Sequence, residues 1–221
     1  MIFLITASLA LKLCGFLYIF ILVTSAASAG LGNRNDEKDS GLKFPIIAEN
    51  PSQYSNGVYL GIISHLGILA ISGMLFLAFS SFDRSLAMIG SLLRLGEGLI
   101  LIYNEVSVLR LLDMAKEYML TDSSKAGLRM LGDQILQTKN TRFMVGLLFL
   151  AVGAIIYGIL FIQSEAIPPI IAWLGLAAGT ISSIGILITF ATGFDLIYSI
   201  GLVSIMVFEV IFGGWLLFYS S

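Results

Sequence analysis

Apolar residues run through this chain in six long stretches, separated by two polar segments and three short polar turns. About 20 apolar residues cross the hydrocarbon core of a bilayer as a helix. We therefore expect transmembrane helices over residues 2–31, 57–82, 86–112, 143–164, 170–191 and 196–219, with polar loops at 32–56 and 113–142. The pattern predicts an all-α bundle of six transmembrane helices in one membrane domain, 1–221, whose loop between the third and fourth helices is partly helical.

The third apolar stretch carries polar residues inside it. At 100° per residue, Arg94, Glu97, Asn104 and Glu105 fall on one side of a helix, and the opposite side is apolar. A charge near the middle of a membrane costs about 2.5–3.5 kcal/mol on insertion scales. These side chains are therefore expected to face the interior of the bundle, where partners or water can reach them.

Three other spans carry a lysine, histidine or glutamate: Lys12 lies in the first, His65 in the second and Glu209 in the sixth. Arg94 and Glu97 are three residues apart and can pair on one helix face. One arginine cannot neutralise three carboxylates, so at least one carboxyl is expected to be protonated, hydrated or paired with His65 or Lys12. The candidate buried polar cluster or ligand site is Arg94, Glu97, Asn104, Glu105, Glu209 and His65.

The first polar segment has mixed charge and ends in a turn at Asn50-Pro51. Within it, the stretch 44–47 is apolar and is expected to rest on the membrane surface. Ser55 or Asn56 is the expected cap of the next helix.

The second polar segment contains an amphipathic pattern in which Leu128, Leu131 and Ile135 share one face. With Ser123 or Ser124 as its cap, it is expected to be a surface helix or a helical extension of the third span.

Small residues recur every four positions in the fifth span, at Gly175, Gly179 and Ser183. Side chains of this size let helix backbones approach closely, so we expect a helix-packing face here, which also permits oligomerisation.

Composition supports a membrane location. The chain is 57% hydrophobic and 12% charged, against about 45–50% and 25% in soluble domains. A net charge of −2, without a dense basic run, gives no reason to expect nucleic acid as a partner. One histidine and one cysteine offer little for a metal site, so neither a metal nor a cofactor is expected. The common hydrolase, metalloprotease and phosphate-loop motifs are missing from the sequence.

The first stretch has an alternative interpretation as a signal peptide, because Ala27-Ser28-Ala29 has the form of a cleavage site. Its apolar region is longer than such peptides use, which favours an uncleaved first helix.

Four short stretches resemble a known family. They are Gly15-Phe16-Leu17-Tyr18, the run from Gly73 through Phe82 to Ser85-Leu86-Ala87, Leu93-Arg94-Leu95-Gly96-Glu97, and Glu209 with Trp215-Leu216-Leu217. In this order they are similar to the domain of unknown function 4386 family of multi-pass prokaryotic membrane proteins. The resemblance implies a helical bundle in the plasma membrane and no particular activity.

The distribution of basic residues gives two different orientations. The loops 32–56 and 113–142 hold eight of the twelve lysines and arginines, which by the positive-inside rule places both loops in the cytoplasm. The resemblance instead implies basic N-termini and basic short turns, with both chain ends in the cytoplasm, and Arg84 lies in such a turn. The orientation stays open at this point.

Three classes of function fit the sequence. The first is a non-catalytic accessory, regulatory or ligand-sensing bundle, in which the polar groups need only each other. The second is a small transporter or channel that uses Arg94, Glu97 and Glu209 as its pathway. The third is a membrane-embedded enzyme, which requires a cleft beside Glu97 or His65. Membrane lipid is the expected partner, with a second copy, a membrane protein or an unidentified small molecule as further partners.

Overall fold

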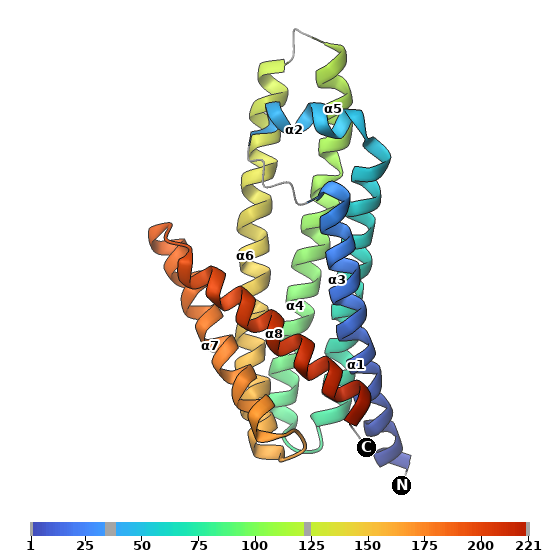
Figure 1. Ribbon diagram of the computed structural model, residues 1–221, viewed down its shortest axis with the longest axis vertical. Helices are drawn as coiled ribbons and strands as arrows, with labels where there is room; N and C mark the ends of the chain where they lie inside the picture. Colours follow the sequence, from blue (N-terminus) through green and yellow to red (C-terminus); the bar gives the residue numbers. More distant parts are fainter. Residues whose placement is uncertain (1, 34–38, 122–124, 220–221) are drawn as a thin grey trace.

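The computed structural model describes residues 2–33, 39–121 and 125–219. Nearly all of these residues are helical (Figure 1). The elements are α1 (Ile2–Ser28), a π-helical turn (Ala29–Asn33), α2 (Ser40–Glu49), α3 (Pro51–Phe79), α4 (Arg84–Val108), α5 (Arg110–Leu120), α6 (Lys125–Ser164), α7 (Pro169–Thr192) and α8 (Leu196–Tyr219).

Six helical segments in the described part of the chain are long and apolar enough to cross a membrane. They are Leu9–Leu31, Pro51–Phe79, Arg84–Leu120, Lys125–Ser164, Pro169–Thr192 and Leu196–Tyr219. The predicted all-α bundle with six transmembrane helices is therefore confirmed.

The six spanning helices pack as neighbours along one bundle. α3 lies against α1 and α4, α6 lies against α4 and α7, and α8 lies against α7 and α1. Figure 1 shows α8 crossing the bundle obliquely, in front of α4 and α6, until it meets α1 near the chain termini. The interior on this side is closed by α8.

Several helices extend beyond their apolar stretches and form a second packed region. α2, α5 and residues 125–142 of α6, which together we call the head, enclose their own apolar core with parts of α3 and α4. A methyl group at Gly132 of α6 would lie 2.6 Å from the Phe44 ring of α2. From Gly132 to Phe143, where the apolar stretch begins, α6 rises about 16 Å at 1.5 Å per residue. The head therefore projects from the membrane part.

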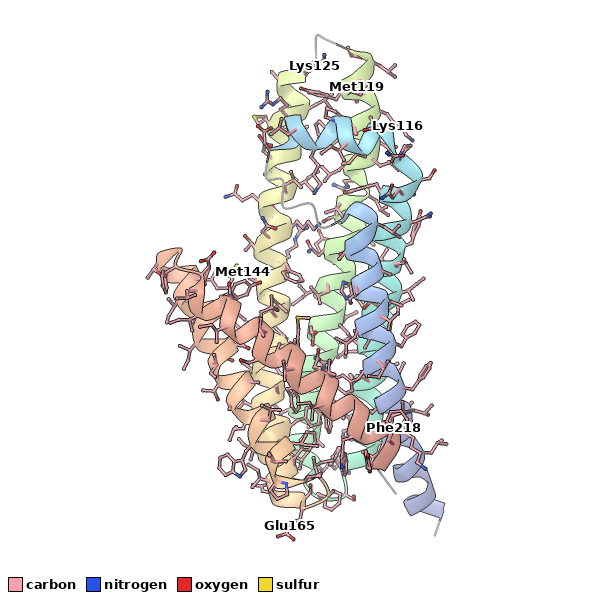
Figure 2. All side chains as sticks on the ribbon, in the orientation of Figure 1. Lys116, Met119, Lys125, Met144, Glu165 and Phe218 are labelled. Carbon is pink, nitrogen blue, oxygen red and sulfur yellow. The ribbon has the colours of Figure 1, made fainter. Side chains whose placement is uncertain are left out.

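The two ends of the molecule differ in character. Figure 2 shows Lys116, Met119 and Lys125 at the head end of the long axis, and Glu165 at the opposite end. The head end is formed by long helices, whereas the opposite end has short connections such as the turn before α4. In that turn the Asp83 carboxylate accepts hydrogen bonds from the backbone N–H groups of Ser85 and Leu86, which caps the helix.

The predicted polar loop 32–56 is wrong in two respects. It contains α2, whose Phe44 and Ile47 are buried in the head core and do not rest on a membrane surface. The next helix begins at Pro51, and neither Ser55 nor Asn56 caps it, because proline is well suited to the first helical position.

The predicted boundaries of the third and fourth spans are also too narrow. After an interruption at Leu109, the third span continues as α5 to Leu120. The amphipathic pattern that begins near Leu128 belongs to α6 and is continuous with the fourth span, so it extends that span and not the third. Hydropathy marks where the apolar surface ends, and these helices continue because the head core buries their next turns. The proposed caps Ser123 and Ser124 lie outside the described residues.

Candidate functional site

The buried face of α4 brings its arginine and first glutamate together. Arg94 is 3% exposed and Glu97 is 2% exposed. Arg94 Nη1 donates to Glu97 Oε2 at 2.8 Å, across one helical turn. The opposite face, with Leu92 and Leu99 more than half exposed, is turned toward lipid. The predicted pair and the predicted stripe on α4 are therefore present.

α8 supplies the second carboxylate. Arg94 Nη2 donates to Glu209 Oε1 at 3.3 Å. The Glu209 side chain is 13% exposed, against 3% for the side chain of Glu97. We refer to Arg94, Glu97 and Glu209 as the charged triad, in which one guanidinium faces two carboxylates.

The charged triad lies near the middle of the membrane part. A methyl group at Gly153 of α6 would lie 3.8 Å from the Arg94 side chain. From Phe143 to Gly153, α6 rises about 15 Å, which is half of a hydrocarbon core of about 30 Å. The triad is therefore at a depth where unpaired charge is most costly.

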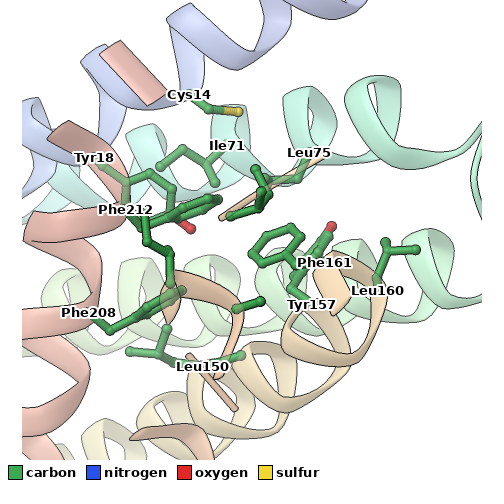
Figure 3. Close-up of a cluster of buried hydrophobic side chains, with 14 of the residues drawn as sticks. Cys14, Tyr18, Ile71, Leu75, Leu150, Tyr157, Leu160, Phe161, Phe208 and Phe212 are labelled. Carbon is green, nitrogen blue, oxygen red and sulfur yellow. The ribbon is translucent and has the colours of Figure 1, made fainter. Parts of the chain in front are cut away.

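Aromatic side chains surround the charged triad. The Arg94 guanidinium lies over the Tyr18 ring of α1, 5.7 Å from its centroid, which adds a cation–π attraction. Tyr157 of α6 shares a 2.7 Å hydrogen bond with the Ser91 hydroxyl, one turn before Arg94. Figure 3 shows Tyr18, Tyr157, Phe161 and Phe212 gathered in the buried cluster between the helices.

A small cavity adjoins the charged triad. Its lining residues are Tyr18, Arg94, Leu150, Ala154, Tyr157, Phe161, Phe208, Glu209 and Phe212, from α1, α4, α6 and α8. Its volume is about 10 Å³, about the space that one water molecule requires. Arg94 Nε is buried and has no hydrogen-bond partner among the described residues. The site therefore leaves one donor unpaired beside a space of water size.

The remaining predicted cluster residues lie elsewhere. His65 Nε2 is 3.9 Å from Glu105 Oε1, and Asn104 donates to the Lys139 backbone carbonyl at 3.2 Å. From Arg94 to Glu105, α4 rises about 16 Å. The expectation of one polar cluster is thus corrected to two layers, because residues on one helix face can still differ in height along the helix.

The predicted helix-packing residues of α7 contact helices of the same chain. A methyl group at Gly175 would lie 2.7 Å from the Phe208 ring, and one at Gly179 would lie 2.6 Å from the Ala151 carbonyl oxygen. The Ser183 hydroxyl is buried without a partner in the described part of the chain. The neighbouring Ser182, which the spacing did not single out, donates to the Gly201 carbonyl at 2.8 Å.

Sequence reasoning missed Tyr18, Tyr157 and Ser91. Tyrosine and serine in an apolar helix are ordinary packing residues by composition, and no spacing links residues on three different helices. Gly15, three residues before Tyr18, was the one feature of the sequence that could have pointed to this part of α1. A methyl group at Gly15 would lie 2.5 Å from the Leu217 backbone nitrogen of α8, so this glycine marks where α1 and α8 meet.

Six membrane-crossing helices with charged side chains gathered inside them define a multi-pass helical membrane protein. The model of one family, the domain of unknown function 4386 (DUF4386), matches residues 13–219, and the chain belongs to that family. No curated protein and no solved structure matched the chain. The resemblance seen in the sequence is thus confirmed. Three of the stretches that carry it, 15–18, 93–97 and 209–217, meet at the charged triad.

Proposed function

We propose that this protein is a non-catalytic accessory, regulatory or ligand-sensing membrane bundle, whose conformation depends on the charged triad. The observation that carries this proposal is that the charged triad is buried and has very little free space beside it. Arg94 and Glu97 are almost fully buried, and the adjoining cavity has room for about one water molecule. Such an arrangement is suited to holding helices in place and to responding to a small ligand.

One helix connects the triad to the head, which supports a regulatory role. α4 carries Arg94 at mid-membrane and Val108 in the head core. α5 follows after Leu109, where the Leu112 N–H bonds to the Leu109 carbonyl in a tighter turn. A rotation or shift of α4 at the triad would therefore reach the head through a rigid element.

The alternative of a small transporter or channel has one observation in its favour. The cavity lies between α8 and the rest of the bundle, and Arg94 and Glu209 both line it. A movement of α8 would enlarge this space and expose both groups. The enzyme alternative is less well supported, because neither Glu97 nor His65 lines this cavity.

Vesicle experiments distinguish the first two functions. The purified protein is reconstituted into vesicles with an imposed proton, sodium or potassium gradient, and ion movement is followed with indicator dyes. We expect wild type, E97Q and empty vesicles to leak at the same rate. A gradient-driven flux that E97Q and E209Q abolish, while E165Q in the exposed connection after α6 retains it, would support the transporter instead.

A positive test of the regulatory role follows hydrogen exchange in the head. We expect Arg94→Gln to change the exchange rates of α2 and α5 amides, although neither helix touches the triad. The matched control is Arg110→Gln, which alters an exposed arginine of α5. Exchange in the head that is unchanged by Arg94→Gln would contradict the proposal.

We further propose that the protein lies in the plasma membrane of a prokaryote, with the head in the cytoplasm as the positive-inside rule favours. Lipid is its first partner, and a second copy or another membrane protein is a further one. The native Cys14 is buried and should not react with a water-soluble thiol reagent. In a Lys116→Cys variant, the new thiol in the head is therefore the one that the reagent labels. Labelling of that thiol in intact cells by an impermeant reagent would place the head outside, and Glu165→Cys provides the opposite-end control.

A further inference from the structure

We propose that the charged triad binds one exchangeable proton for its two carboxyls, Glu97 and Glu209, and that this proton keeps α8 seated on the bundle. The proposal rests on the proposed function, in which the charged triad is a binding site and not an ion pathway. The ligand of this site is then a proton. The argument uses the charges at the site, the groups around it and the size of the cavity.

The charges at the site do not balance without a ligand. Arg94 carries one positive charge and pairs with two carboxylates at 2.8 and 3.3 Å. With both carboxyls ionised, the triad would hold a net charge of −1 at mid-membrane. Leaving a buried charge uncompensated is strongly unfavourable. One added proton makes the site neutral and leaves one carboxylate for Arg94.

No second cation faces the triad from the described parts of the elements around it. The neighbouring titratable side chains are Cys14 and Tyr18 on α1 and Tyr157 on α6, all neutral when protonated. Lys12 of α1 is exposed. α3 places His65 beside Glu105, in the other polar layer. α7 has no ionisable residue, and α8 contributes Glu209 itself. The described residues therefore supply no compensating positive charge, which leaves a bound ligand as its source.

The size of the cavity selects the ligand. A volume of about 10 Å³ admits one water molecule and excludes organic cations. A metal cation would need several oxygen ligands, and no group of three His, Cys, Asp or Glu side chains is placed to hold one in the described residues. A proton needs only one carboxyl oxygen and no coordination shell.

The geometry also provides an entry point. Glu209 is the more exposed of the two carboxyls and lines the cavity, whereas Glu97 does not line it. A water molecule in the cavity can accept a hydrogen bond from Arg94 Nε, which has no partner in the described structure. The proton passes from water to a Glu209 oxygen and returns to water when it is released, while Arg94 keeps all of its own protons and orients both carboxyls.

Infrared spectroscopy of the protein in lipid nanodiscs tests the proposal. We expect wild type at neutral pH to show the carbonyl band of a protonated carboxyl, shifted in heavy water because the proton exchanges. Glu97→Gln and Glu209→Gln each leave one carboxylate for Arg94, so both variants should lose the band. Glu165→Gln, at an exposed connection, should keep it.

Three results would overturn the proposal: no such band in wild type, a band that persists in both triad variants, or loss in one variant only. The last would mean that one carboxyl stays protonated even when Arg94 has no other carboxylate to pair with, so that charge balance is not what binds the proton. The wild-type measurement requires no variant to fold, so a poorly folding variant leaves the proposal testable. Ion flux in vesicles would contradict the proposed function, whereas a missing carboxyl band contradicts this inference alone.

A second wild-type measurement follows stability against pH. A native state that holds a proton released on unfolding binds more protons than the unfolded chain, so stability falls as pH rises. We expect the unfolding midpoint to fall with rising pH in wild type, and this part of the dependence to disappear in Glu209→Gln. An identical pH dependence in the two proteins would also overturn the bound proton.

Discussion

The Arg94 guanidinium of α4 donates to the Glu209 carboxylate of α8 at 3.3 Å, across 115 residues of sequence. α8 packs mainly on α1 and α7, so this contact ties the oblique last helix to the interior of the bundle. The Arg94–Glu209 contact and the Arg94–Glu97 pair use the same guanidinium. Arg94 therefore links α8 to the interior of the bundle.

Replacing Arg94 by glutamine should destabilise the protein strongly. Removing one partner of a buried ion pair costs about 3–5 kcal/mol, because the charge left behind has no compensation. Arg94→Lys should cost less, since it keeps the charge but cannot donate to both carboxyls in the same way. Unfolding in mixed micelles with increasing denaturing detergent measures the difference. Arg110→Gln, at an exposed arginine, should change stability little, and an equal loss there would contradict the explanation.

The local part of the site could be predicted from the sequence, because helical geometry alone places Arg94 and Glu97 on one face. Glu209 followed from a count of charges in the apolar spans. Tyr18 and Tyr157 could not be predicted, since their role depends on how separate helices cross. His65 lies beside Glu105, one of the pairings that the charge count left open. The separation of this pair from Arg94 could not be predicted, because hydropathy gives the face of a helix but not the height at which its neighbours meet it.

The fold was also only partly predictable from local patterns. The membrane spans could be predicted as apolar stretches. The head could not, because α2 and the start of α6 bury only one side of each helix and their sequences are therefore mixed. Phe44 is fully buried although its short apolar stretch lies inside a polar segment of the sequence. Its partners come from α5 and α6, about 70 to 90 residues further along the chain, and no local pattern predicts that contact.

Two adjacent glycines of α8 should respond in opposite ways to the same substitution. A methyl group at Gly213 would lie 2.7 Å from Tyr18 Cβ, whereas one at Gly214 would have nothing within 4 Å. Gly213→Ala should therefore push α8 from α1 and cost about 1–3 kcal/mol. Gly214→Ala should be neutral or stabilise the helix by up to about 1 kcal/mol. The same unfolding assay compares them, and equal effects would mean that α1 and α8 are not packed as described.

The attachment of α2 to the head should depend on Asp133. Its carboxylate accepts the Ser40 N–H at 2.7 Å, a donor at the start of α2 that has no partner within the helix. Asp133→Ala should weaken the docking of α2 by about 0.5–2 kcal/mol, the usual cost of losing such a cap. Limited proteolysis should then cut near α2 faster. Gln134→Ala, the adjacent exposed position, should leave the cleavage rate unchanged, and faster cleavage in both would indicate a general effect.

Neutralising the whole triad should restore much of the stability that Arg94→Gln removes. A buried ion pair can often be replaced by neutral groups at little cost, whereas breaking it leaves an unpaired charge. In the triple variant Arg94→Gln, Glu97→Gln, Glu209→Gln no charge remains at mid-membrane. We expect its unfolding free energy to lie closer to wild type than to Arg94→Gln. A triple variant as unstable as the single one would show that the hydrogen-bond geometry, and not the charge balance, holds α8 in place.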